Sequence, residues 1–192
     1  DLAPFVQVAP TCQSLKEFLD VFDLLYPLLR TPEAVERIAY ELVEDSAREN
    51  IRYLEVRFAP VLQATRSFPV EEVIEATLKG LDRGRKEFGT SSGMILCLFR
   101  SHSPSENRKA FEPLKKMYDG RRVVGMDLAG DEARYPTLEF ADFFQEAKHC
   151  GIRATCHAGE TVGTANLVAA LELQVDSIGH GTHLMEDPEL LK

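Results

Sequence analysis

The chain has 192 residues, of which 44% are hydrophobic and 28% charged, and its formal net charge is −9. This length allows one domain with a full core, and the composition is ordinary for a globular protein in water. No apolar run approaches ~18 residues, so we expect no membrane partner and no membrane span. The negative charge opposes non-specific binding to nucleic acids.

The opening residues and the cysteines indicate in which cellular compartment the chain is found. The first residues carry no basic segment of the kind that begins a signal peptide. The four cysteines form no Cys-x-x-Cys pair, so a thiolate zinc site or a thioredoxin-like site is not expected. We therefore expect a cytoplasmic chain with reduced thiols.

The first fifty residues predict helices. After an irregular opening of about 12 residues, apolar positions recur at spacings of three and four from Ser14 to Leu29. A second helix begins at Pro32, because proline suits the first helical position. This helix ends near Asn50, a residue that tolerates the left-handed conformation. We expect residues 1–50 to hold these leading helices.

The apolar period then changes, and strands alternate with helices. The predicted strands cover residues 52–60, 94–99, 123–128, 151–156 and 175–179. The predicted helices cover residues 70–88, 105–118, 138–150 and 165–173, with another opening at Pro188. Such alternation implies parallel strands with right-handed crossovers. No glycine-rich dinucleotide or phosphate loop follows any strand, which argues against a Rossmann or P-loop domain.

The short, regular units favour an α/β fold that is a partial (β/α)8 TIM-like barrel. About five of the eight strands are present. We expect residues 1–192 to form a single incomplete barrel domain, in which successive βα units occupy residues 51–192.

Polar residues cluster where three successive predicted strands end. Residues 127–132 follow one strand, His157 and Glu160 follow the next, and residues 179–183 follow the last. Parallel α/β folds place their chemistry at the carboxyl ends of strands. An imidazole is a good zinc ligand, and a carboxylate three residues later can transfer protons beside the metal. Three such clusters in succession favour an active site over scattered surface polar residues.

Five segments stand out by their order and spacing, namely Tyr40–Glu44, Tyr53–Pro60, Gly125–Glu132, His157–Glu160 and Ile178–His183. Together they resemble the adenosine deaminase family of zinc-dependent aminohydrolases, which implies a TIM-like barrel of the metal-dependent hydrolase type. The resemblance extends over almost the whole chain, and the order and spacing of these segments are together specific. It implies an enzyme of purine metabolism whose full-length form deaminates adenosine hydrolytically to inosine and ammonia. The implied attacking group is a zinc-activated hydroxide.

The resemblance also implies roles for four residues. His157 is similar to a zinc ligand of the family. Glu160 is similar to the acid that protonates purine N1 while water attacks C6, and His180 to the histidine that orients the zinc-bound hydroxide. Gly130 resembles the glycine whose backbone N–H contacts purine N3. One Zn2+ per full-length active site and a small-molecule purine substrate follow from the same resemblance.

Two family segments have no counterpart in this sequence. The family's first barrel strand carries His-x-His, with two zinc ligands, and its last strand carries an Asp-Asp pair, one residue for zinc and one for the substrate. We expect a fragment that lacks both strands. Because one histidine cannot hold catalytic zinc against water, we expect the isolated chain to be inactive. Its open sheet edges favour self-association.

Alternatives stay open for the function and for the neighbours of the site. The chain could belong to an adenine or other aminopurine deaminase, or be a non-catalytic short form that binds a partner or a purine. We interpret Asp127 as a structural carboxylate and His183 as a packing or hydrogen-bonding residue. Asp131 and Glu132 receive no role, and His102 is interpreted as part of a solvated loop.

Overall fold

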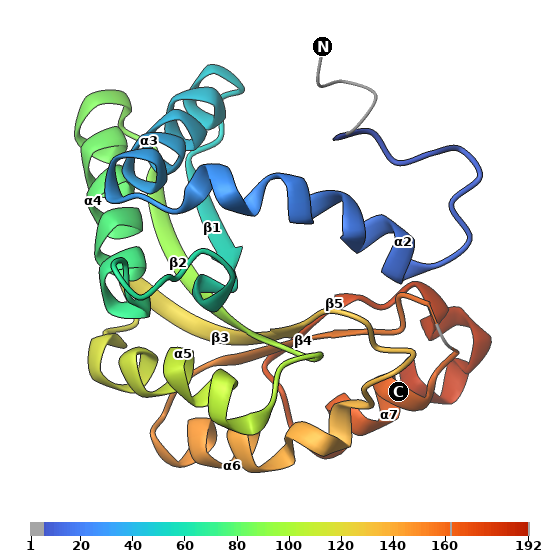
Figure 1. Cartoon of the computed structure of the whole chain (residues 1–192). Coiled ribbons are helices and arrows are strands. Elements are labelled where there is room, and N and C mark those ends of the chain that lie inside the picture. The colour runs from blue at the N-terminus through green and yellow to red at the C-terminus, as the bar shows by residue number, and fades with distance from the viewer. Residues whose placement is uncertain (1–5, 162, 192) are drawn as a thin grey trace. The chain divides into compact units, whose positions relative to one another are not determined.

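The computed structural model describes residues 6–161 and 163–191 (Figure 1). Backbone contacts divide the chain into two compact units, Asp1–Met94 and Ile95–Lys192. The prediction of a single domain stays a prediction. Among the described residues, no helix is both long enough and apolar enough to cross a bilayer.

The first unit opens with one short helix and two 3₁₀ turns. Helix α2 (Leu15–Asp20) is followed by 3₁₀ helices over Val21–Leu24 and Tyr26–Leu29. The apolar period predicted one helix over this whole region. The α-helix ends at Asp20, and Pro27 lies in the first turn of the second of these 3₁₀ helices, a position that suits a residue without a backbone N–H. None of the three segments has a buried residue, so packing does not hold them in one helix.

Two long helices pack closely against each other in this unit. They are α3 (Pro32–Arg48), whose N-terminus is capped by Thr31, and α4 (Val70–Phe88), which ends at the left-handed Gly89. A Cβ placed on Gly80 would lie 2.2 Å from the backbone oxygen of Glu36. The missing side chain on α4 therefore allows the two helix backbones to approach.

The rest of the first unit consists of strand and loop. Strand β1 (Tyr53–Phe58) is followed by a 3₁₀ helix over Pro60–Leu62, and strand β2 (Ser91–Phe99) begins at the end of the unit. A hydrophobic cluster lies between the helices and the loop before α4. Its buried members are Val35, Phe68, Val73 and Ala76.

The second unit holds three parallel strands. They are β3 (Val123–Ala129), β4 (Ala154–Ala158) and β5 (Ser177–His180). The helices of this unit are α5 (Pro104–Met117), α6 (Ala141–His149) and α7 (Ala165–Glu172). Three 3₁₀ helices cover Thr137–Phe140, Thr182–Glu186 and Pro188–Leu191. Figure 1 shows the three α-helices on one side of these strands.

The five strands form one sheet in the order β1-β2-β3-β4-β5. Sequential strands alternating with helices are the arrangement of a (β/α)8 barrel, so the predicted α/β fold with five strands is confirmed. Among the strands, the predicted start differs by three residues both at β2, which starts at Ser91 rather than residue 94, and at β4, which starts at Ala154 rather than residue 151. Gly151 has a φ of 69° and belongs to the turn that ends α6, so the extended backbone begins later.

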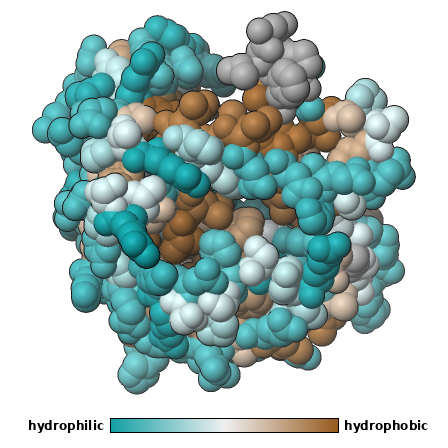
Figure 2. Space-filling model, in the orientation of Figure 1, coloured by the Kyte–Doolittle hydropathy of each residue, from teal (hydrophilic) through white to brown (hydrophobic). Residues whose placement is uncertain are grey.

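Large apolar side chains remain exposed in the first unit. They include Leu24, Leu28, Ile38 and Tyr53, with between 50% and 63% of their surface accessible. Figure 2 shows apolar residues open to the viewer on the face drawn there. Exposed apolar surface of this kind is typical of interaction sites. Self-association through open sheet edges stays a prediction.

Candidate functional site

The carboxyl ends of β4 and β5 bring three predicted site residues together. In the parallel register, His157 lies opposite Gly179 and Ala158 lies opposite His180. The ring centroids of His157 and His180 are 5.0 Å apart. Atom Nε2 of His180 lies 3.6 Å from Oε1 of Glu160. We call His157, Glu160 and His180 the site cluster.

A buried carboxylate lies next to the Nδ1 side of the His157 ring. Oδ2 of Asp127, on the neighbouring strand β3, lies 2.8 Å from Nδ1 of His157, and the Asp127 side chain is 0% exposed. This short contact does not have the angles of a hydrogen bond, because the ring plane is turned away from the carboxylate oxygen. A histidine whose Nδ1 faces a carboxylate keeps Nε2 for a metal, and such carboxylates orient metal-binding histidines. This geometry agrees with a structural role for Asp127.

Gly130 occupies a crowded position directly after β3. Its φ is 105°, and a Cβ placed there would lie 3.3 Å from the backbone nitrogen of Arg100 and 3.4 Å from Cε2 of Phe99. Glycine suits both the conformation and the lack of space. Phe99 ends β2, so Gly130 belongs to the same end of the sheet as the site cluster.

Sequence reasoning gave no role to Glu132, yet this residue contacts the loop that carries Glu160. Its side chain is 2% exposed. It accepts hydrogen bonds from the backbone N–H groups of Gly159, Glu160 and Thr161, at 3.0, 2.6 and 2.7 Å. No local signal in the sequence shows that an acid contacts a loop 27 to 29 residues later.

Other buried polar side chains hold the backbone around the site. Arg100 is 1% exposed and donates to Oγ1 of Thr137 at 2.9 Å and to the backbone oxygen of His157 at 2.7 Å. Asn166 accepts from Thr137 and donates to the backbone oxygen of Glu132 at 3.1 Å. Burial lowers the pKa of Arg100, while nearby thiol and carboxyl groups act in the opposite direction. These contacts join the ends of β2 and β4.

The remaining two histidines near the strand ends behave differently. His183 lies 2.7 Å from Oε1 of Glu186, in keeping with a hydrogen-bonding role. His102 lies in a loop, as predicted, but its side chain is partly buried. Its ring packs on Phe99 with centroids 5.3 Å apart, its Nδ1 is buried, and burial lowers its pKa.

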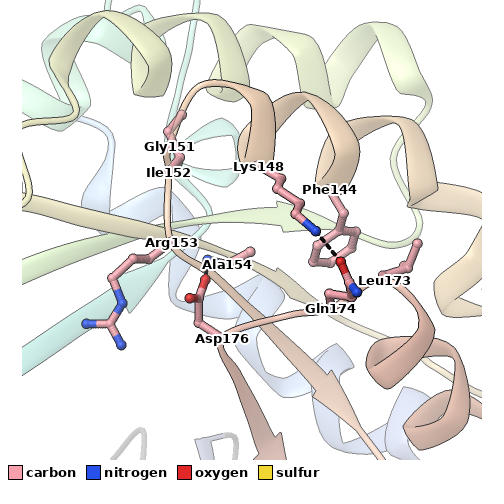
Figure 3. A pocket seen from close by; sticks show the side chains of 9 residues that line it. All are labelled: Phe144, Lys148, Gly151, Ile152, Arg153, Ala154, Leu173, Gln174 and Asp176. Atoms are coloured by element: carbon pink, nitrogen blue, oxygen red, sulfur yellow. Dashed lines mark hydrogen bonds between the residues drawn. The ribbon is translucent and has the colours of Figure 1, made fainter.

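A pocket of about 220 Å³ lies at the opposite end of β4. Figure 3 shows the side chains of Lys148 and Gln174 joined by a hydrogen bond in its lining, and Arg153 directed away from them. Asp176 accepts from the backbone of Ala154, the first residue of β4, at 2.7 Å. The pocket therefore lies at the amino end of the strand and does not include the site cluster.

The geometry around His157 fits that of one ligand in a zinc site. Among residues 6–161 and 163–191, no group of three or more His, Cys, Asp or Glu side chains could hold a metal ion. His157 with Asp127 behind it has the form of one zinc ligand with its orienting carboxylate. The described residues thus do not form a complete zinc site, and His157 is the candidate ligand in it.

The fold and the site define a barrel-type α/β protein with a histidine–carboxylate cluster at the carboxyl ends of its strands. Residues 1–192 match the family model described as adenosine deaminase, and the chain belongs to this family.

Known proteins are similar over nearly all of the chain. The adenosine deaminase of Clostridium botulinum (strain Kyoto / Type A2) is 38% identical over 197 residues, which cover 100% of this chain and 57% of that protein. A zinc-bound amidohydrolase from Burkholderia ambifaria has a TM-score of 0.88 and 27% identity, over 98% of this chain and 52% of that one. Arabidopsis ADAL complexed with IMP has a TM-score of 0.78 and 27% identity, over 94% of this chain and 54% of that one. The chain spans little more than half the length of these relatives.

Gly159 gives a prediction about the loop that carries Glu160. Its φ is 65°, and a Cβ there would lie 2.8 Å from the side chain of Leu167, which is fully buried. We expect Gly159→Ala to lower the free energy of unfolding by about 2–4 kcal/mol, through both backbone strain and overpacking. Gly151→Ala is the control, because Gly151 has a φ of 69° but no atom within 4 Å of the added Cβ. Urea unfolding should show a loss of only about 1–2 kcal/mol for this control. Equal losses in the free energy of unfolding for the two variants would contradict a contribution from the clash with Leu167.

Proposed function

We propose that the full-length protein containing this chain removes the 6-amino group of a purine by hydrolysis, with adenosine as the substrate. The observation that supports this proposal is the site cluster at the carboxyl ends of β4 and β5, in a chain of the adenosine deaminase family. The similar proteins support a purine as the substrate, since several of them are adenosine deaminases and Arabidopsis ADAL has been crystallised in complex with IMP.

Each residue of the cluster would do one part of the chemistry. Water adds at C6 while Glu160 transfers a proton to N1, and ammonia then leaves, so that adenosine and water become inosine and ammonia. His180, within 3.6 Å of Glu160, would orient the attacking water. The backbone N–H of Gly130 would bind purine N3, where a side chain has no room.

His157 would hold zinc in the full-length protein, oriented by Asp127. When bound, zinc acts as a Lewis acid and lowers the pKa of a bound water to near neutrality. The chain's own contribution is the position of the imidazole at the end of β4, next to His180 and Glu160.

A second candidate is deamination of a related aminopurine rather than adenosine. Its support is the similarity to the N6-methyl-AMP deaminase of Arabidopsis thaliana, 28% identical with a TM-score of 0.75. A non-catalytic short form that binds a purine or a partner is the third candidate. Cytoplasmic location and lack of nucleic-acid or membrane partners belong to the proposal in all three cases.

We expect the isolated 192-residue chain to show no zinc-dependent deamination, because its described residues include no group of three or more side chains that could hold a metal ion. The chain extended at both ends, with the family's His-x-His and Asp-Asp segments restored, should release ammonia from a purine. The measurement is ammonia release from adenosine, adenine and AMP, with and without a chelator. Turnover by the isolated chain in proportion to bound zinc would contradict the prediction. The ratio of kcat/KM values among the three substrates separates the first two candidates.

A further inference from the structure

The side chain of Glu132 makes an unusual set of contacts. Both of its carboxylate oxygens accept from backbone N–H groups of one short loop. Oε2 accepts from Gly159 at 3.0 Å, and Oε1 accepts from Glu160 at 2.6 Å and from Thr161 at 2.7 Å. A carboxylate with several backbone donors is among the stronger hydrogen-bond arrangements in proteins.

The loop needs such a partner because no regular structure satisfies its donors. Strand β4 ends at Ala158 and helix α7 begins at Ala165. Gly159 has a left-handed φ of 65°, so the chain turns immediately after the strand. Buried backbone N–H groups without a partner are costly. Glu132 supplies that partner from the segment after β3, through a side chain that is 2% exposed.

Other contacts hold the same loop from its other sides. Thr182 donates to the backbone oxygen of Gly159 at 2.5 Å, and the backbone N–H of His183 donates to that oxygen at 3.2 Å. Arg100 donates to the backbone oxygen of His157, two residues earlier. Glu132 thus accepts from three N–H groups of the loop, while neighbouring segments donate to the carbonyl groups of Gly159 and of His157 in β4.

We propose that Glu132 is a positioning residue that fixes the backbone of Gly159–Thr161 and thereby aims the Glu160 side chain at His180 and at the purine ring. This inference rests on the proposed function for the role of Glu160. Glu132 is too buried to contact a substrate, so its effect reaches the reaction only through the loop. A shift of about 1 Å in a reacting group can cost about 10²-fold in rate.

The direct test is Glu132→Gln in the full-length protein. Glutamine has one acceptor oxygen, and its NH₂ group would point a donor at another donor. It cannot serve both Gly159 on one side and Glu160 and Thr161 on the other. We expect kcat to fall by about 10- to 100-fold, with KM changed by less than about threefold. Glu132→Asp keeps two acceptor oxygens on a shorter side chain, and its kcat should lie between those of Glu132→Gln and the unchanged protein.

A matched control is available in the same unit. Asp119 accepts from the backbone N–H groups of Arg121, Arg122 and Val123 at 2.8, 2.7 and 3.2 Å, just before β3 begins. All three donate to Oδ1, which asparagine would keep, so the control is Asp119→Ala, which removes the same kind of contact at the amino end of a strand, far along the chain from the cluster. It should leave kcat within about twofold of the unchanged protein if position matters rather than general stability.

Amide hydrogen exchange provides a readout that does not depend on activity. The N–H groups of Gly159–Thr161 should exchange at least about tenfold faster in Glu132→Gln and should be unaffected in Asp119→Ala. Unchanged exchange in this loop, or a kcat loss equal to that of Asp119→Ala, would overturn the inference. A full-length protein that deaminates no purine overturns the proposed function instead, and the exchange result then still decides whether Glu132 fixes the loop.

Discussion

Replacing Glu160 by glutamine in the full-length protein is expected to lower kcat by about 10²–10⁴-fold and to leave KM nearly unchanged. Glutamine has the same shape and can still hydrogen-bond, but it carries no proton that it can transfer to purine N1. In the structure the Glu160 carboxylate lies 3.6 Å from His180, on a loop whose backbone is held by Glu132. Steady-state rates of ammonia release measure the effect.

The matched control for this change is Glu172→Gln. Glu172 is exposed and ends helix α7, in the same unit as Glu160 but away from the strand ends. Its replacement should leave kcat unchanged within about twofold, as for most surface substitutions. If Glu160→Gln retained the rate of this control, Glu160 would not be the proton donor.

Replacing His157 by alanine is expected to remove bound zinc and, with it, measurable deamination. The imidazole of His157 is the metal ligand that we propose, and the loss of a ligand leaves an incomplete tetrahedral site. Asp127→Asn should have a smaller effect, because losing an orienting carboxylate typically weakens metal binding by about 10–100-fold. Zinc content after dialysis, measured by atomic emission, checks both expectations.

His149→Ala is the control for nonspecific loss of metal. His149 is exposed at the end of helix α6 and has no contact with the site cluster among the interactions described above. This variant should keep one zinc per protein and full activity. Full zinc content in His157→Ala would show that the metal is held elsewhere and would remove His157 from the site.

Much of the fold follows from local patterns in the sequence. Helix α4 matches its predicted range, residues 70–88, because apolar spacing is regular and Gly89 ends it in the left-handed conformation. The expected continuous helix over residues 14–29 is instead three short segments, and none of them has a buried residue that would stabilise a longer helix. Periodicity predicts which face of a helix is apolar, but it does not show whether tertiary packing will support the helix.

The site could be predicted in part for a different reason. Parallel strands end at one edge of a sheet, so residues that follow successive strands are expected to meet, as His157 and His180 do. The partners of these residues depend on register and on loop paths. Asp127 faces His157 because it pairs with Thr155 across β3 and β4, and no sequence pattern gives that register. The contact of Glu132 with the loop at Gly159–Thr161 could not be predicted either, because it depends on the paths of two loops.

The most direct test of the site is a crystal structure of the full-length protein with zinc and inosine, the product of the proposed reaction. We predict a metal ion bound by Nε2 of His157, and a purine ring with N1 within hydrogen-bonding distance of Glu160 and N3 near the backbone N–H of Gly130. A metal bound without His157, or a purine held away from the carboxyl ends of β3, β4 and β5, would contradict the account.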